Sequence, residues 1–271
     1  MKKILLSIAA AALIFSGCTK TTDSPGRLVV KVTDDPFNIS YVESATITVT
    51  KVEIRKKGEH QGNPYLVISE DTLTFDLLDL RNGITLDLID LEIPAGTYDL
   101  VRLYVDEAGL QLKGQHQGFR VKVPSGKQTG IKIFLNPALE VSGGLTSELL
   151  LDFDLARSFV MRGNMSHAAG VNGFIFKPCI RASNISTSGR IAGLVTDTSK
   201  VKLINAKVWV MQDTVVSTAF TDTLGHYAFI GVPAGTYSVF ATKEDYDTVK
   251  HDDIKVIEGN RTFVSFELTK K

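Results

Sequence analysis

Apolar and polar residues alternate at a period of two along much of the chain, and this pattern constrains the fold most. Residues 45–50 read Ala-Thr-Ile-Thr-Val-Thr, and residues 264–268 read Val-Ser-Phe-Glu-Leu. Successive side chains of a strand point to opposite faces, so this period predicts strands with one buried face. The sequence contains no long amphipathic helix pattern. Many short strands divided by turn signals predict an all-β chain of sandwiches or barrels.

Two local features refine the strand pattern in the first half of the chain. The apolar phase slips by one residue after Val49, to Val52 and Ile54, which predicts a β-bulge near Lys51. The segment 77–91 is ambiguous between strand and helix, but its Asn-Gly pair at 82–83 predicts a turn inside it.

Composition excludes several classes of protein. The 30 Lys and Arg residues balance 30 Asp and Glu residues, so the basic surplus typical of nucleic-acid binders is missing. An apolar share of 44% with 22% charged residues is typical of globular chains and too apolar for disorder. A length of 271 residues favours about two domains. The two cysteines, Cys18 and Cys179, exclude a disulfide scaffold.

The N-terminus has the three parts of a secretory signal peptide. A basic start is followed by an apolar run over residues 4–15 and then by small residues, and the run is too short to span a bilayer. Phe15-Ser16-Gly17-Cys18 resembles the lipobox of bacterial lipoproteins, although Phe15 stands where leucine is usual. The resemblance implies that residues 1–17 are removed and that Cys18 carries the lipid. The alternative is an ordinary signal peptide with an incidental cysteine.

Residues 18–26 are polar and are predicted to form a flexible tether between the lipid and the first strand. The acyl chains of a lipoprotein cysteine hold a protein at a membrane more firmly than one myristoyl chain does. Thr19 after the cysteine matches no inner-membrane retention signal, so we expect the outer membrane, on its periplasmic or its outer side.

The mature chain is predicted to contain two β-sandwich domains, over residues 27–184 and 189–271. The polar stretch 183–189 is interpreted as a linker between them. Seven strands in the second domain suit a small Greek-key sandwich. They are expected at residues 191–196, 206–211, 215–221, 226–231, 236–243, 248–257 and 262–268.

One motif occurs in both domains. Residues 93–98 read Ile-Pro-Ala-Gly-Thr-Tyr, and residues 232–237 read Val-Pro-Ala-Gly-Thr-Tyr. Pro and Gly favour a tight reversal, after which the tyrosine is expected to enter the core. Because the surrounding spacings differ, we interpret the motif as shared turn chemistry and not as a tandem duplication.

Several motifs of the second domain carry a family resemblance. They are Gly193-Leu-Val-Thr-Asp197, Ile204-Asn-Ala-Lys-Val208, Thr221-Asp-Thr-Leu-Gly-His-Tyr-Ala-Phe229 and Val232-Pro-Ala-Gly-Thr-Tyr237. With these motifs, residues 189–271 resemble the carboxypeptidase regulatory-like domain, although Asp245-Tyr246 stands where the family commonly has Gly-Tyr. The resemblance implies a non-catalytic, transthyretin-like sandwich.

The first domain resembles a family of domains of unknown function found in bacterial lipoproteins. The motifs are Val32-Thr-Asp-Asp-Pro36, Phe75-Asp-Leu-Leu-Asp-Leu-Arg-Asn-Gly83, Ile93-Pro-Ala-Gly-Thr-Tyr-Asp-Leu-Val-Arg-Leu103, Val123-Pro-Ser-Gly126 and Leu151-Asp-Phe-Asp154. This resemblance implies a β-sandwich and offers no activity.

The sequence contains none of the common catalytic motifs. The Gly-x-Ser-x-Gly elbow, the phosphate-binding loop, the dinucleotide fingerprint and the His-Glu-x-x-His motif are all missing, and the five histidines are scattered. Carboxylates are plentiful, but the aromatic density expected around a sugar-cleaving cleft is low. We therefore expect no enzyme and no cofactor.

Trp209, the only tryptophan, is one candidate binding residue. Its neighbours Val208 and Val210 point to the other face of their strand, so the indole is expected on the outer face. It either covers a sandwich edge or a domain contact, which we favour because no second exposed aromatic is evident, or stacks on a sugar ring.

Acidic residues give candidate calcium ligands in three places. Asp152 and Asp154 share one face of a strand, Asp34 and Asp35 precede a proline, and the last two, Asp197 and Asp222, lie in loops. Calcium needs several oxygens at short range. The favoured alternative is structural, because aspartate initiates turns and forms the wet face of amphipathic strands.

Four triplets of Asp, Thr and an aliphatic residue resemble an O-glycosylation consensus for exported bacterial proteins. Chance gives about one or two such triplets, which is the competing explanation. The acceptor residues would be Thr72, Thr214, Thr223 and Thr248.

Together these features predict a lipid-anchored, extracytoplasmic protein with a non-catalytic binding or structural role in the cell envelope. Its partners would be the membrane, through the lipid, and a glycan or another envelope protein. The first alternative is a carbohydrate-binding module of a glycan-utilisation system, and the second is an enzyme of unknown type.

Overall fold

The computed structural model describes residues 24–35, 42–59, 61–115, 118–124, 126–163 and 171–271. Within these ranges most residues lie in β-strands, and the helices are single turns: η1 (Leu77–Leu80), α1 (Leu155–Ser158) and η2 (Ile185–Thr187). None of the helices in the described ranges is long and apolar enough to cross a membrane. The all-β prediction is confirmed. Cys18 and the signal peptide lie outside the described residues.

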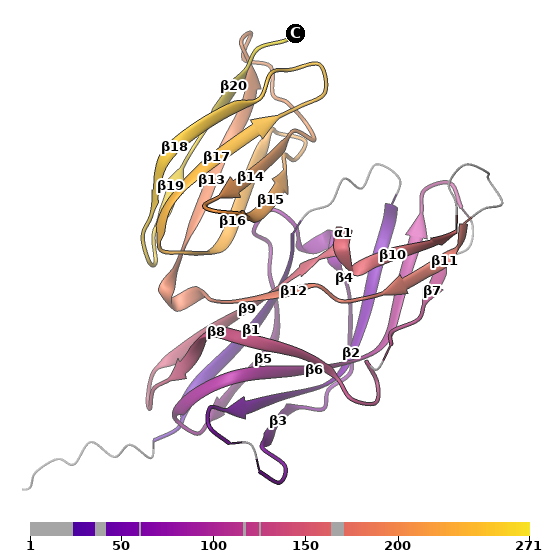
Figure 1. Ribbon diagram of the computed structural model, residues 1–271, viewed down its shortest axis with the longest axis vertical. Helices are drawn as coiled ribbons and strands as arrows, with labels where there is room; N and C mark the ends of the chain where they lie inside the picture. Colours follow the sequence, from indigo (N-terminus) through magenta and orange to yellow (C-terminus); the bar gives the residue numbers. More distant parts are fainter. Residues whose placement is uncertain (1–23, 36–41, 60, 116–117, 125, 164–170) are drawn as a thin grey trace, which may run out of the picture.

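Two sheets face each other in the first domain (Figure 1). The smaller sheet has the order β12-β9-β1-β5, formed by Ile180–Asn184, Thr146–Asp154, Gly26–Asp35 and Leu86–Ile93. The larger has the order β3-β2-β6-β7, formed by Tyr65–Ser69, Val42–Lys56, Gly96–Leu112 and Phe119–Val121. Two further strands, β4 (Leu73–Asp76) and β8 (Ile131–Val141), pair with β2 and β6. The hairpin of β10 (Phe159–Gly163) and β11 (Val171–Phe176) completes the domain.

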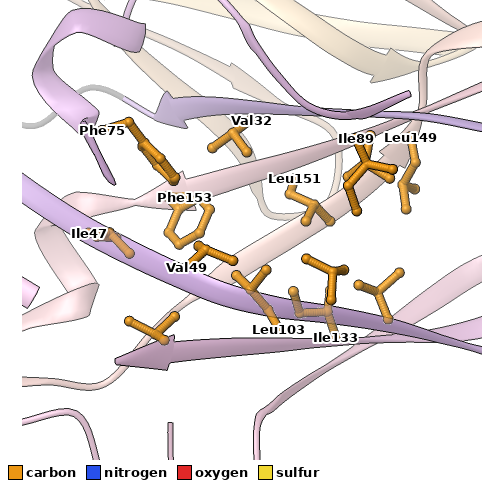
Figure 2. Close-up of a cluster of buried hydrophobic side chains, with 14 of the residues drawn as sticks. Val32, Ile47, Val49, Phe75, Ile89, Leu103, Ile133, Leu149, Leu151 and Phe153 are labelled. Carbon is orange, nitrogen blue, oxygen red and sulfur yellow. The ribbon is translucent and has the colours of Figure 1, made fainter. Parts of the chain in front are cut away.

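Alternating side chains of both sheets fill the core between them. Figure 2 shows Val32, Leu149 and Leu151 from the smaller sheet lying across from Val49 and Leu103 of the larger one. The strands β1 and β9 run parallel, whereas the other strand pairs in the described part of the first domain are antiparallel. Their pairing places every second residue of both strands in the core and the residues between them on the outer face.

The phase slip near Lys51 is a β-bulge, as predicted. The pairing of β2 with β6 matches Val49 to Val105 and Lys51 to Tyr104, so Thr50 is the extra residue on β2. The predicted Asn-Gly turn is also present, since Asn82 and Gly83 both have positive φ angles, of 55° and 81°, between η1 and β5.

The second domain is a smaller sandwich with its own core. One sheet has β13 (Ser188–Asp197) between β16 (His226–Pro233) and the pair β19 (Arg261–Phe263) and β20 (Phe266–Leu268). The other has the order β15-β14-β17-β18, formed by Val215–Phe220, Lys207–Met211, Gly235–Thr242 and Val249–Val256. Because β19 and β20 both pair in parallel with β13, they form one interrupted strand, and the count is the predicted seven.

The prediction that residues 183–189 form a linker is wrong. Ser183 and Asn184 belong to β12, Ser188 and Gly189 begin β13, and only the single turn η2 separates them. The polar composition has a different cause, because Asn184 accepts a hydrogen bond from the Ser186 amide and so caps this turn. The two domains are therefore joined by one ordered turn.

The repeated Pro-Ala-Gly-Thr-Tyr motif forms the same hydrogen bond in both domains. The Tyr98 hydroxyl donates to the Pro94 carbonyl at 2.7 Å, and the Tyr237 hydroxyl donates to the Pro233 carbonyl at 2.8 Å. Both rings are buried, and burial raises the pKa of both phenols. The prediction that each tyrosine enters its core after a tight reversal is confirmed.

Candidate functional sites at the domain junction and on the outer sheet face

The smaller sheet of the first domain supplies one side of the domain junction. Because Leu151 and Phe153 of β9 face the core, Asp152 between them faces outward. In the sheet it stands beside Arg181 of β12 and Thr33 of β1. The Thr33 hydroxyl lies within hydrogen-bonding distance of the carbonyls of Leu80 and Ile84, which holds the Asn-Gly turn against this face.

Arg181 connects this face to the second domain. Its Nη2 donates to Asp152 Oδ2 at 2.5 Å, and its Nη1 donates to the carbonyl of Val216 on β15 at 2.5 Å. The Asp152 side chain is only 6% exposed. Burial raises the pKa of Asp152, and the attraction of Arg181 opposes that rise. Hydrogen bonds donated by a charged guanidinium are strong and directional, so the two that Arg181 makes help to fix the orientation of the second domain relative to the first.

A cavity of about 20 Å³ lies beside this ion pair, between the domains. Thr33, Asp34, Gly83 and Asp152 line it from the first domain, and residues 217–218 and 228–230 line it from the second. Asp152 Oδ1 is buried and has no hydrogen-bond partner in the described part of the protein. The volume suits one water molecule, which would satisfy this oxygen.

The two carboxylates predicted to share a metal have different partners. Asp154 caps α1 by accepting from the Arg157 amide at 2.8 Å and pairs with Arg157 Nε at 2.5 Å, whereas Asp152 pairs with Arg181. Within the described ranges, no three His, Cys, Asp or Glu residues lie close enough to hold a metal ion. A cation at Asp152 and Asp154 would have to displace both guanidinium groups. The loop aspartates Asp197 and Asp222 accept backbone amides in their own turns, as the structural interpretation predicts.

Trp209 lies on the outer face of the second domain's four-stranded sheet. Val208 and Val210 are fully buried in the core, as predicted. However, β14 is an inner strand, so Trp209 does not cover a sheet edge. Its indole stacks on Phe240 of the neighbouring strand β17, with ring centroids 5.0 Å apart and planes 3° from parallel. The tryptophan is therefore half of an aromatic pair, so the expectation that it covers a sandwich edge, and the reason given for it, that no second aromatic lies nearby, are both wrong.

Two lysines flank this aromatic pair. Lys207 Nζ lies 5.5 Å from the Trp209 ring, and Lys250 Nζ lies 5.5 Å from the Phe240 ring. Both contacts fall within the range of cation–π attraction. The strand register places Lys250 opposite Phe240 and Phe240 opposite Trp209, which aligns the four side chains across three strands. Sequence reasoning missed Phe240 because nothing local to β17 reveals which residue of β14 stands opposite.

The four candidate O-glycosylation residues are all exposed, in turns or next to strand ends. The hydroxyl of one of them, Thr248, donates to Thr242 Oγ1 at 3.0 Å. Their exposure satisfies the first requirement for modification, and the modification itself stays a prediction.

The fold and these surfaces define a two-sandwich protein whose domains are connected by a single turn and contact each other through the hydrogen bond from Arg181 to the Val216 carbonyl. The chain belongs to the family described as a domain of unknown function, DUF4382, whose model matches residues 25–178. A second model, the carboxypeptidase regulatory-like domain, matches residues 190–269. Both family resemblances seen in the sequence are confirmed. No curated protein matches the chain.

Solved structures with similarity to the chain include three Gram-positive proteins. The Bacillus anthracis TIE protein is 14% identical with a TM-score of 0.26, and the match covers 91% of this chain and 34% of that one. The minor pilin GBS52 of Streptococcus agalactiae is 11% identical at 0.25, covering 91% and 96%. The major pilin subunit BcpA of Bacillus cereus is 12% identical at 0.25, covering 92% and 100%. The chain thus spans about a third of the TIE protein, and superpositions at these TM-scores support no functional argument.

Proposed function

We propose that the protein is a lipid-anchored lipoprotein of the cell envelope, held at the outer membrane through Cys18, with a non-catalytic binding or structural role. The observation that carries the proposal is the lipobox-like sequence 15–18, which ends a few residues before β1 begins at Gly26. A lipid on Cys18 would therefore hold the first sandwich close to the membrane surface. The single-turn connection and the Arg181 contact support a body that presents its second domain in a defined orientation.

The anchor is tested by Cys18→Ala in cells grown with labelled palmitate. The expected result is loss of the label and release of the protein from the membrane fraction. Cys179→Ala is the matched control, because it removes the other cysteine and should leave both properties unchanged. A Cys18→Ala protein that still sediments with membranes and still carries the label would contradict the proposal.

The Trp209–Phe240 pair favours carbohydrate binding as a second candidate function. Sugar rings bind through their C–H faces to aromatic rings, and the partly exposed Trp209–Phe240 pair with its two lysines places aromatic and hydrogen-bonding groups side by side on this face. Titration of the full chain with a glycan panel should shift the Trp209 emission if sugar binds here. Trp209→Ala and Phe240→Ala should each abolish binding while circular dichroism stays unchanged. A panel that leaves the emission unchanged at millimolar concentration would argue against this site.

A further inference from the structure

The outer face of the six-stranded sheet in the first domain contains a groove of about 420 Å³. It lies over β2, β4, β6 and β7, on the side away from the core shown in Figure 2. Its volume falls within the range of small-ligand sites. The groove begins at Thr48, next to the bulge, and extends away from it along the sheet, and it shares no lining residue with the cavity at the domain junction.

The two halves of this outer face differ in chemistry. Beyond the bulge, Glu53 pairs with Lys51 at 2.6 Å and with Arg102 at 3.1 Å, and the Arg102 guanidinium lies 3.3 Å from the centre of the Tyr65 ring. These long side chains cover that half of the sheet. The half with the groove instead carries small hydroxyl residues, namely Ser44, Thr46, Thr48 and Thr74.

Two glycines, Gly109 and Gly118, line the groove, and their missing side chains make it deeper. Gly109 is an interior residue of β6, where glycine weakens a strand and often marks close approach of a ligand. A Cβ atom there would lie 2.6 Å from Thr46 Oγ1, and a Cβ at Gly118 would lie 2.7 Å from Gln111 Oε1. The two glycines therefore leave room for polar atoms of their neighbours at the bottom of the groove.

The hydrogen-bonding groups of the groove suit a ligand rich in hydroxyls. The Thr48 and Thr74 hydroxyls lie 2.8 Å apart, and no hydrogen bond within the described part of the chain engages those of Ser44 and Thr46. A hydroxyl both donates and accepts, so such a row matches a partner of the same kind. A peptide that extends a sheet needs a free strand edge, whereas this groove lies on a sheet face.

The charge of the groove is balanced. Its charged lining residues are Arg120 and Glu107, which pair with each other at 3.1 Å. A net positive site would favour an anionic ligand, and this pair cancels that preference. We propose that the groove binds a short neutral oligosaccharide, with Ser44, Thr46 and Thr48 as hydrogen-bonding groups. This groove includes neither Cys18 nor the Trp209–Phe240 pair, so the proposal can be tested independently of the lipid anchor and of the aromatic site.

The test is isothermal titration calorimetry on the full chain in a detergent without a sugar headgroup. The probes are maltotriose, cellotriose, xylotriose and N-acetylchitotriose, with trigalacturonate as the anionic comparison. At least one neutral trisaccharide should bind, and trigalacturonate should bind more weakly. Failure of every neutral probe at millimolar concentration, or preference for trigalacturonate, would overturn the proposal.

Variants locate the binding. The double variant Thr46→Val and Thr48→Val keeps the side-chain shapes and removes two hydroxyls, so affinity should fall roughly tenfold or more. Thr50→Val is the matched control on the same strand outside the groove and should bind like the wild type. Trp209→Ala should also leave this binding unchanged. Binding that survives the double variant, or that Trp209→Ala removes, would place the sugar elsewhere and contradict the assignment.

Discussion

Arg181 and Asp152 form an ion pair of 2.5 Å within the first domain, and the same arginine reaches the second domain. The two residues stand opposite each other on β12 and β9. The sheet itself therefore sets the position of the guanidinium before the domains meet. The contact with the Val216 carbonyl then needs little further ordering of the arginine side chain.

Arg181→Ala should destabilise the protein strongly. It removes the hydrogen bond to the Val216 carbonyl and leaves the Asp152 carboxylate buried without its guanidinium partner, which costs about 3 kcal/mol or more. Urea unfolding followed by far-UV circular dichroism measures the free energy. The matched control is Arg157→Ala, because the Arg157 side chain is 73% exposed and its pair with Asp154 should contribute less than about 1 kcal/mol. Equal losses in the two variants would contradict this account of the junction.

Asp152→Asn should change how stability depends on pH. Burial raises the pKa of Asp152 above its ordinary 3.8, while Arg181 lowers it and Asp154 raises it further. A carboxyl with a raised pKa in the folded state favours folding at low pH, and this contribution is lost as the pH rises through that pKa. The unfolding free energy of the wild type, relative to Asp152→Asn, should therefore fall as the pH is raised from 3.8. A difference that stays flat or rises over this range would refute the direction.

Tyr98→Phe and Tyr237→Phe should have matching effects in different domains. Each removes a hydroxyl that donates to a proline carbonyl four residues earlier, at a cost of about 1 kcal/mol. Hydrogen exchange of backbone amides can assign each loss, because Tyr98→Phe should accelerate exchange in the first domain and Tyr237→Phe in the second. If one variant loses stability and the other does not, the repeated motif does not have one physical role.

Gly193→Ala should disrupt the second domain. A Cβ at this position would lie 1.7 Å from the Val264 carbonyl oxygen and 2.9 Å from the Tyr227 ring, so the backbone itself must move. We expect a loss of about 3 kcal/mol or more in thermal or urea unfolding. Gly144→Ala is the comparison, because its φ of +72° is strained for alanine but nothing lies within 4 Å, and the cost should be about 1–2 kcal/mol.

Local patterns were sufficient to predict the strands and several details of the fold. The alternation at Val264, Phe266 and Leu268 matches three buried side chains, and the slip near Lys51 is a bulge. These features depend on a period of two within one segment, so the sequence contains them. The division into two sandwich domains could also be predicted, because each domain has its own apolar alternation and turn signals.

Contacts between distant strands could not be predicted in the same way. Phe240 stands opposite Trp209 only because of the register between β17 and β14, and Arg181 meets Val216 only after two folded domains dock. The groove on the larger sheet also depends on pairing, since Gly109 matters through its position opposite Thr46. The small polar residues near Ser183 were interpreted as a linker. Strands and turns at a domain junction carry the same residue types, so composition alone could not distinguish the two.

The parallel pairing of β13 with β19 and β20 has a consequence for the order in which the protein forms. One edge of β13, the first strand of the second sandwich, pairs with β16, but its other edge pairs only with strands formed by residues 261–268. The last strand of the first sandwich, β12, ends at Asn184, so all strands of that domain are present before β13 emerges. During synthesis or export from the N-terminus, the first domain can therefore complete its sheets while the second must wait for its final residues. A nascent chain stalled before residue 261 would expose the open edge of β13 beside a folded neighbour.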